Sequence, residues 1–377
     1  MKRYLTAPLS TDLGRKLVIL TGPRQVGKTT LAREMMADFL RPQYLNWDVA
    51  TDRRMLLDQS WGLRTDLLIM DEIHKMRDWK GYLKGIVDSR PTGQSILITG
   101  SARMETFRQS GASLAGRYFS HRLHPFSVRE WVELTDASPD AALDRLLVRG
   151  GMPEPFLAEN PIDAERWRRQ YFTDLIREDV LEFSRIHEIK AMRLLVDLLR
   201  ERVGSPLSIA SLARDLQVAS NTITKYLDIL EALFIIFLVR PYHRNIARAI
   251  LKEPKAYFFD TGFVTGDEGA KWENACAAML LKHVHFQQDS HGKQTTLHYL
   301  RTKDGAEIDF LLCENDTPTH LIECKHADNH PTAAVMKFAG LFPQAQTIQL
   351  VRELRQEEYR RPVSILKGAQ WLATLDA

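Results

Sequence analysis

The sequence has few of the features that mark secreted or membrane proteins. Its three cysteines, Cys276, Cys313 and Cys324, form neither a C-x-x-C pair nor a plausible disulfide framework, which is typical of a reducing compartment. The most apolar stretch, Leu230 to Val239, is too short to span a bilayer. The basic N-terminus lacks the apolar core of a signal peptide. These absences predict a soluble, cytoplasmic protein.

Neither sign of charge is in large excess. Lys and Arg number 51 against 48 Asp and Glu, so the net charge of +3 does not by itself indicate a nucleic-acid or membrane partner. Any basic surface has to be local. With 377 residues, 44% of them hydrophobic, the chain is long enough to form three domains that each bury a core.

A phosphate-binding pattern stands near the N-terminus. Residues 22–29 read G-P-R-Q-V-G-K-T and fit G-x-x-x-x-G-K-[ST]; an apolar run precedes them and a helical pattern follows. In such a loop Lys28 reaches the β and γ phosphates of ATP and Thr29 ligates Mg²⁺, while the helix N-terminus adds partial positive charge. The predicted nucleotide-binding residues are Gly22, Pro23, Arg24, Gln25, Val26, Gly27, Lys28, Thr29 and Thr30.

Two adjacent carboxylates end the next strongly apolar run. Residues 66–72 read D-L-L-I-M-D-E, the pattern of a buried parallel strand of the Walker B type. Asp71 is the predicted second ligand of Mg²⁺, and Glu72 is the predicted residue that positions or deprotonates the attacking water. The alternative is that both acids cap the helical segment that follows.

Two further residues are candidates for γ-phosphate chemistry. The apolar run 95–101 reads as the strand beside Walker B, and it ends at Ser101, which is placed to sense the γ phosphate. Arg117 lies on a short turn before a strand and is the candidate arginine finger, since a guanidinium stabilises a transferring phosphoryl group. Loop hydrogen bonding by Ser101 and a surface role for Arg117 stay open as alternatives.

The middle of the chain is predicted to be helical. Segment 136–203 has amphipathic patterns at 141–148, 164–181 and 190–202, with a break at Gly150-Gly151-Met152-Pro153. In segment 204–254, two apolar faces flank a tight turn at 218–220, which predicts a helix-turn-helix. The residues expected at the end that enters the major groove are Asn221, Thr222, Thr224 and Lys225.

Strands at 234–240 and 255–259 are the predicted wing of this segment. The stretch 239–256 is locally basic, which favours contact with DNA; its basic residues are Arg240, Arg244, Arg248, Lys252 and Lys255. The alternative is a winged helix that only packs against a neighbouring domain or another protein.

The C-terminal segment, 255–377, contains a predicted hairpin. Runs 308–313 and 320–325 flank a turn-rich stretch, and in a hairpin symmetric about Asp316 the side chain of Asp309 lies opposite Glu323. Lys325 shares the face of Glu323 through the period of two. This convergence is the core of a PD-(D/E)XK nuclease site, in which two carboxylates hold Mg²⁺ or Mn²⁺ and the lysine positions or activates the water that attacks a phosphodiester.

The chain resembles a family, the prokaryotic AAA-type ATPases with a C-terminal domain of unknown function. The matching pieces cover nearly its whole length: T-G-P-R-Q-V-G-K-T-T, L-L-I-M-D-E-I-H, I-L-I-T-G-S-A, L-A-G-R-Y, H-P-F-S-V-R-E-W, W-E-N-A, G-A-E-I-D-F and I-E-C-K. The resemblance implies an α/β fold: a P-loop ATPase of the ASCE type with a parallel sheet (1–135), a helical lid or linker (136–203), a winged-helix-like segment (204–254) and a restriction-endonuclease-like domain (255–377). It also implies that Glu273 completes the acidic cluster.

These features together predict an ATPase coupled through a winged helix to a metal-dependent nuclease that acts on DNA, assembled as a homo-oligomer. Two alternatives stay open. One is a nucleotide-switched DNA-binding or scaffold protein whose nuclease-like fold does not cut. The other is a signal-transducing ATPase whose C-terminal domain binds another protein. Whether the arginine finger acts within one chain or on a neighbour also stays open.

Overall fold

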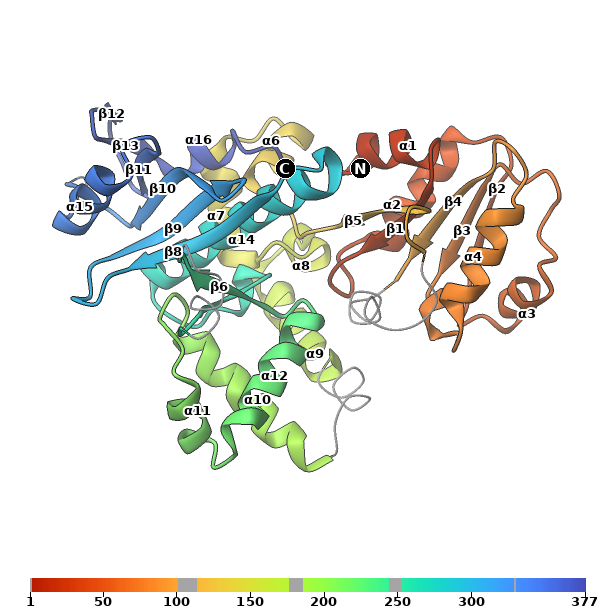
Figure 1. Cartoon of the computed structure of the whole chain (residues 1–377), viewed down its shortest axis with the longest axis horizontal. Coiled ribbons are helices and arrows are strands. Elements are labelled where there is room, and N and C mark those ends of the chain that lie inside the picture. Colours follow the sequence, from red (N-terminus) through yellow and green to blue (C-terminus); the bar gives the residue numbers. More distant parts are fainter. Residues whose placement is uncertain (1, 101–113, 176–185, 244–251, 329) are drawn as a thin grey trace. The chain divides into compact units, whose positions relative to one another are not determined.

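A computed structural model describes residues 2–100, 114–175, 186–243, 252–328 and 330–377 (Figure 1). The chain divides into two compact units. The N-terminal unit comprises Met1–His124 with Ala232–Phe234, and the C-terminal unit comprises Pro125–Glu231 with Ile235–Ala377. Of the helices in the described ranges, none is long and apolar enough to cross a membrane.

The N-terminal unit is built on a five-stranded parallel sheet with the order β2-β3-β4-β1-β5. Every residue of the inner strands β1, β3 and β4 is buried, as expected for a parallel sheet covered on both faces. The predicted neighbourhood of β4 and the Walker B strand β3 is confirmed. The strands are β1 (Leu17–Thr21), β2 (Pro42–Asn46), β3 (Leu67–Asp71), β4 (Ser95–Thr99) and β5 (Tyr118–Arg122).

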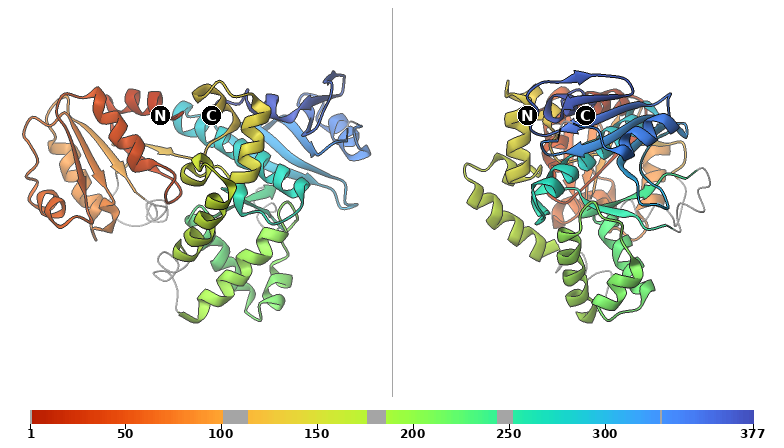
Figure 2. Two further views of the ribbon diagram at one scale, coloured as in Figure 1. Left: turned by 180° about the vertical axis from the view of Figure 1, so that it is seen from behind. Right: turned by 90° about the vertical axis from the view of Figure 1, so that its left-hand side faces the viewer.

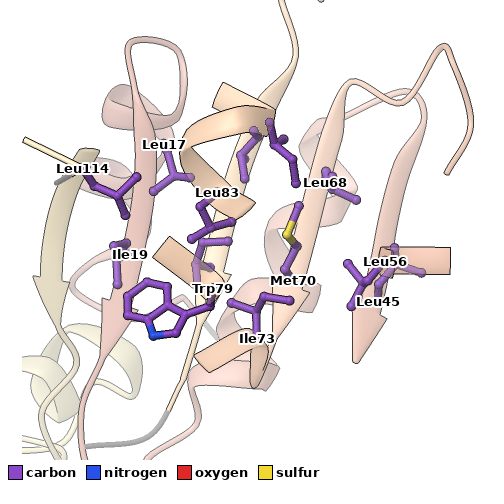
Figure 3. Packing of buried hydrophobic residues seen from close by; sticks show 13 residues of the cluster. Leu17, Ile19, Leu45, Leu56, Leu68, Met70, Ile73, Trp79, Leu83 and Leu114 are labelled. Atoms are coloured by element: carbon purple, nitrogen blue, oxygen red, sulfur yellow. The ribbon is translucent and has the colours of Figure 1, made fainter. Parts of the chain in front are cut away.

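Helices cover both faces of this sheet. Trp79 and Leu83 of α4 pack on Leu17 and Ile19 of β1 and on Met70 of β3 (Figure 3). Figures 1 and 2 show α1 and α2 on the opposite face. The helical elements are α1 (Thr6–Leu13), α2 (Lys28–Met35), η1 (Met36–Asp38), α3 (Ala50–Asp58), η2 (Ile73–Lys75) and α4 (Trp79–Ser89). The fold of this unit is therefore the expected P-loop α/β arrangement.

The C-terminal unit contains a mixed eight-stranded sheet with the order β12-β13-β11-β10-β9-β8-β6-β7. β10, β11 and β13 run parallel, whereas β8, β9 and β10 form an antiparallel meander. The strands are β6 (Ile236–Pro241), β7 (Lys255–Phe258), β8 (Thr295–Arg301), β9 (Glu307–Glu314), β10 (Thr317–Lys325), β11 (Gln346–Val351), β12 (Glu358–Tyr359) and β13 (Val363–Lys367).

The helices of this unit confirm the helical middle of the chain. They are α6 (Val128–Leu134), α7 (Pro139–Arg149), α8 (Pro153–Leu157), α9 (Pro161–Leu175), α10 (Ile186–Glu201), α11 (Ile209–Asp215), α12 (Ser220–Ala232), η5 (Thr261–Phe263), α14 (Glu268–His291), α15 (Ala333–Leu341) and α16 (Gly368–Leu372). The predicted break after α7 has a physical cause. Gly150 has a φ of +75°, and a Cβ there would lie 2.1 Å from Oδ1 of buried Asp260.

The two units do not follow the bounds of the four predicted segments. Residues 125–135, with α6, belong to the C-terminal unit, because buried Glu130 on α6 pairs with buried Lys282 on α14 at 2.8 Å. The same ammonium donates to the Ser127 hydroxyl at 3.0 Å. The predicted wing strands do pair, as antiparallel β6 and β7, but β6 also pairs with β8. The wing is thus the end of the eight-stranded sheet.

The Glu130–Lys282 pair generates a stability prediction. Lys282→Ala leaves a carboxylate buried without its cation, so we expect the free energy of unfolding to fall by about 3–5 kcal/mol. Lys271→Ala is the matched control on the same helix, because Lys271 is half-exposed and its pair with Glu268 spans 4.0 Å. The control should lose at most about 1 kcal/mol.

Urea denaturation of the full chain measures both variants. The double variant Glu130→Gln/Lys282→Met should recover part of the loss, since it leaves no unpaired charge. Equal midpoints for Lys282→Ala and Lys271→Ala would show that the buried pair does not hold α6 on this unit.

Candidate functional site

The phosphate-binding loop lies between β1 and α2, and α2 begins at Lys28. Gly22 has a φ of +145°, and a Cβ there would lie 2.3 Å from the carbonyl oxygen of Leu123, so glycine is required. The ammonium of Lys28 donates to the carbonyl oxygens of Gly22 at 3.0 Å and Pro23 at 2.7 Å. The loop therefore curls around the charge that the sequence assigns to phosphate binding.

Arg3 supports this loop, and sequence reasoning missed it. Its guanidinium is buried and donates to the carbonyl oxygen of Val26 at 3.0 Å and to that of His124 at 2.7 Å. The arginine thereby ties the loop to the segment that follows β5. No local pattern indicates this role, because 23 residues separate Arg3 from Val26.

Asp71 collects three hydroxyl donors at the carboxyl edge of the sheet. Its carboxylate accepts from Thr29 at 2.9 Å, from Tyr44 at 2.5 Å and from Thr99 at 2.6 Å. The Thr29 bond joins the two predicted Mg²⁺ ligands directly. Burial, followed by the bond to Asp71, raises the pKa of Tyr44 to about 12, so this hydroxyl keeps its proton. Sequence reasoning missed Tyr44, since nothing local marks a tyrosine inside β2.

Glu72 follows Asp71 in a left-handed conformation, with a φ of 58°. This conformation is uncommon for a residue with a side chain and occurs often at functional sites. The carboxylate lies 3.4 Å from Nε2 of His74 and 3.8 Å from Nζ of Lys75. Burial, and then the neighbouring Asp71, raises the pKa of Glu72, which makes its carboxylate a stronger base.

The two remaining candidates of this unit have different outcomes. Ser101 lies outside the described residues. Arg117 precedes β5 at the amino edge of the sheet, since Tyr118 pairs in register with Leu17 whereas Thr21 pairs with Arg122. Its guanidinium is paired with Asp88, with Nε 2.8 Å from Oδ1. At roughly 3.3 Å per residue, the length of β1 separates Arg117 from the loop of its own chain.

In the C-terminal unit, the β9–β10 hairpin brings the predicted nuclease-type residues together. Its turn is centred between Asn315 and Asp316, which both have positive φ, not on Asp316 as predicted. A bulge between Pro318 and His320 shifts the register by one residue. From His320 onward the pairs are therefore the predicted ones, and the last of them is Ile322 with Phe310.

Beyond that pair, the side chain of Asp309 takes the place of a backbone partner between the two strands. Its Oδ2 accepts the backbone N–H of Cys324 at 2.8 Å. Glu323 pairs instead with Lys325, with Oε1 2.7 Å from Nζ, and its Oε2 is buried without a hydrogen-bond partner. Burial, followed by the charge of Asp309, raises the pKa of Glu323 to about 7.

Lys255 on β7 lies at the centre of this cluster. Its side chain is 1% exposed, and Nζ lies 2.5 Å from Glu307, 3.5 Å from Glu273 and 3.7 Å from Asp309. Burial lowers the pKa of Lys255, but these three carboxylates outweigh that effect and raise it above its ordinary value. The prediction that counted Lys255 in a DNA-facing basic stretch is wrong, because the side chain is buried against acids.

Glu273 reaches the cluster from α14, as the resemblance implied. It accepts a hydrogen bond of 2.6 Å from the hydroxyl of buried Tyr257, which sequence reasoning also missed. Burial, and then the charge of Asp309, raises the pKa of Glu273 to about 7. The alternation of Lys255 and Tyr257 along one strand is the signal that could have placed both on one face.

The predicted metal ligands of this cluster, Glu273, Asp309 and Glu323, have suitable chemistry, since carboxylate oxygens suit Mg²⁺ and Mn²⁺ and Oε2 of Glu323 has no partner. Their arrangement does not fit such an ion. Across the described ranges, no three Asp, Glu, His or Cys side chains gather closely enough to hold a metal. The ammonium of Lys255 lies within 3.7 Å of both Glu273 and Asp309.

The predicted helix-turn-helix consists of α11 and α12. Asn221, Thr224 and Lys225 are exposed on the first turns of α12, and Thr222 is half-buried. The opposite side of α12 buries Ile223, Tyr226 and Leu227, as the apolar pattern predicted. Of the basic residues proposed beside it, Lys252 is exposed and Arg240 is half-buried, whereas Arg244 and Arg248 lie outside the described residues.

Comparisons with protein families match three parts of the chain. Residues 14–132 match the family described as an AAA domain. Residues 140–269 match a domain of unknown function, DUF8612. Residues 268–367 match another, DUF4143. The AAA match covers the parallel sheet with its loop and its carboxylates, so the N-terminal unit is an AAA-type P-loop domain.

Comparison with solved structures finds the Walker-type ATPase PABY2304 of Pyrococcus abyssi, which is 14% identical with a TM-score of 0.43 over 69% of this chain and 93% of that one. It also finds the RuvB Holliday junction branch migration motor of Thermotoga maritima, which is 18% identical with a TM-score of 0.33 over 66% of this chain and 94% of that one.

Among curated sequences, Uncharacterized protein MJ1544 of Methanocaldococcus jannaschii is 23% identical over 332 residues, which span 79% of this chain and 72% of the relative. Uncharacterized protein Rv2008c of Mycobacterium tuberculosis is 30% identical over 328 residues, which span 82% of this chain and 71% of the relative. The chain therefore belongs to the same family as Rv2008c, with an AAA domain followed by two domains of unknown function.

Proposed function

We propose that the N-terminal unit hydrolyses ATP with Mg²⁺ at the carboxyl edge of its sheet. The observation that carries this proposal is the hydrogen bond of 2.9 Å between Thr29 and Asp71, which joins the loop to the Walker B strand. Thr29 and Asp71 are the residues that would hold Mg²⁺, which when bound neutralises charge on the phosphates. Lys28 supplies a further positive charge within the loop.

Glu72 is the proposed base. Its raised pKa makes the carboxylate a stronger base than an ordinary glutamate, which favours acceptance of a proton from water. The ammonium of Lys75, 3.8 Å away, favours the ionised carboxylate and opposes that rise. The left-handed backbone at Glu72 fixes where the side chain leaves β3.

The first prediction from this proposal separates binding from hydrolysis. Lys28→Ala should lose ATP binding, because the phosphates lose a buried counter-charge. Glu72→Gln should still bind ATP with Mg²⁺ but hydrolyse it about 10² to 10⁴ times more slowly, the usual contribution of a positioned base. Equilibrium binding of a fluorescent ATP analogue and phosphate release measure the two effects.

Thr51→Ala is a suitable control, because Thr51 is an exposed residue of the same unit that hydrogen-bonds only locally, to Asp52. It should resemble the wild type in both assays. Equal turnover in Glu72→Gln and wild type would remove Glu72 from the role of base.

We propose further that Arg117 acts on the nucleotide of a neighbouring subunit in a homo-oligomer. Within one chain it lies at the edge of the sheet opposite to the loop, and Asp88 holds its guanidinium in a partly exposed position. An arginine at that edge can reach a phosphoryl group only in another copy of the chain. Arginine in this role increases hydrolysis by about 10³ to 10⁵.

Mixing variants tests this arrangement. Lys28→Ala and Arg117→Ala chains should each be inactive, and a mixture should regain activity, since some interfaces pair an intact loop with an intact arginine. Arg15→Ala serves as control; its side chain is 66% exposed and its ion pair with Asp12 spans 3.8 Å. A mixture that co-assembles but stays inactive would contradict action between subunits.

For the C-terminal unit, we propose contact with DNA through α12. Exposed Asn221, Thr224 and Lys225 at its start support this, because they offer hydrogen-bond donors and positive charge opposite the apolar face of the helix. In this proposal the nuclease-like cluster does not cut, because Lys255 supplies the cation that its carboxylates require. The protein is then a nucleotide-switched DNA-binding ATPase.

The second candidate is metal-dependent phosphodiester cleavage by Asp309, Glu323 and Lys325, with Glu273 in support. The observation that favours it is the buried, unpartnered Oε2 of Glu323, on a carboxyl whose pKa is raised to about 7. A carboxylate in that state gains from any cation that reaches it.

Metal titration separates the two candidates. We expect Mn²⁺ to leave the melting temperature of the nucleotide-free full chain unchanged, because Lys255 already occupies the cluster. Lys255→Ala should melt at lower temperature and regain stability as Mn²⁺ is added, since a divalent cation then replaces the lost charge. The full chain is required, because segment 255–377 alone leaves buried Lys282 without Glu130.

Asp309→Ala and a cleavage assay on supercoiled and linear DNA complete the experiment. A wild-type rise in melting temperature that Asp309→Ala abolishes, together with cleavage that the same change abolishes, would favour the nuclease. Intact ATP hydrolysis in Asp309→Ala would show that the loss is local.

A further inference from the structure

A pocket of about 340 Å³ in the C-terminal unit is lined by residues of α9, α10 and η5 and by none of the residues of the carboxylate cluster. Four of its lining side chains are arginines: Arg168, Arg169, Arg193 and Arg200. Two acids, Glu165 and Asp197, also line it. A concave site that is lined by more arginines than acids can bind an anion that carries several oxygens.

Two of these arginines are already held in place by protein groups. Arg168 is buried, pairs with Glu165 at 2.9 Å and donates to the carbonyl oxygen of Arg149 at 2.9 Å. Arg200 lies 3.6 Å from Asp197 and donates to the carbonyl oxygen of Phe263 at 2.6 Å. These bonds use both acids of the lining and fix the walls of the pocket.

The other two arginines are not used by the fold. Among the described residues, neither the guanidinium of Arg169 nor that of Arg193 has a hydrogen-bond or ion-pair partner. They come from different helices, α9 and α10, and both line the same pocket. Two positive charges therefore remain in excess. They would balance the negative charge of a phosphate monoester, which is close to two units near neutral pH.

The remaining lining indicates what the phosphate is attached to. Phe172 and Phe263 meet with ring centroids 6.1 Å apart and form an apolar wall. The pocket volume far exceeds that of a phosphate group alone and suits a small organic ligand. A flat nucleobase or a sugar can lie on such a wall, since aromatic rings stack on bases.

We propose that this pocket binds a phosphate monoester carried by a nucleoside, with Arg169 and Arg193 as the residues that recognise the phosphate. The same group is present on a free nucleotide and at the 5′ end of a DNA strand. The pocket is distinct from the P-loop, and the proposal does not depend on ATP hydrolysis or on cleavage.

The test uses Lys28→Ala as background, so that the P-loop does not bind the probes. Calorimetry with AMP and with a short 5′-phosphorylated thymidine oligonucleotide should show binding that weakens as salt is added. The same oligonucleotide with a 5′ hydroxyl should bind at least about tenfold more weakly, since it lacks the monoester. The tighter of AMP and the phosphorylated strand identifies the source of the phosphate.

Arg169→Ala and Arg193→Ala should each weaken binding by about tenfold or more. Both should leave ATP hydrolysis unchanged when made in a chain with Lys28 intact. Arg166→Ala is the matched control on α9: Arg166 is 81% exposed and does not line the pocket, and its loss should not change affinity. Absence of binding by every probe, equal binding of the 5′-hydroxyl strand, or equal effects of Arg166→Ala and Arg193→Ala would each overturn the proposal.

Discussion

A buried carboxylate needs a cation or several donors, and this constraint decides where many elements of both units lie. A carboxylate taken out of water without such partners costs several kcal/mol, which is comparable to the whole stability of a domain. Asp71 satisfies the constraint with hydroxyls from Thr29, Tyr44 and Thr99. Glu130 satisfies it with Lys282, and that pair fixes α6 on α14.

The kind of partner determines what each carboxylate can do. Hydroxyl donors are neutral, so Asp71 keeps its charge available for a cation that arrives with a nucleotide. The carboxylates around Lys255 have a cation that is covalently part of β7 and cannot diffuse away. The two acidic sites therefore differ in kind, even though their sequence patterns both resemble Mg²⁺ sites. For this reason we propose hydrolysis at the first and no cutting at the second.

Local patterns were sufficient for features in which the interacting residues are close in sequence. The P-loop and the order of β3 and β4 were predicted, because glycine spacing and buried apolar runs are local signals. The predicted hairpin pairs were right for a reason that the sequence does not show. The turn is centred half a residue before Asp316, and the bulge between Pro318 and His320 restores the predicted pairing. Lys255 was misplaced because its acidic partners lie on α14 and β9, far along the chain. Arg3 and Lys282 were missed for the same reason, because their partners Val26 and Glu130 are also far away in the sequence.

The position of Lys255 also bears on how the C-terminal unit can respond to DNA. α12 leads within a few residues into β6, and residues 236–239 of β6 pair with β7, the strand that carries Lys255. β6 in turn pairs with β8, which pairs with β9, the strand of Asp309. A paired strand cannot shift along its neighbour without breaking the hydrogen bonds of the ladder. The strand that follows α12 therefore lies in one continuous sheet with the strands of Lys255 and Asp309, and the hydrogen bonds between Asn274 of α14 and Phe258 of β7 hold Glu273 beside the same sheet.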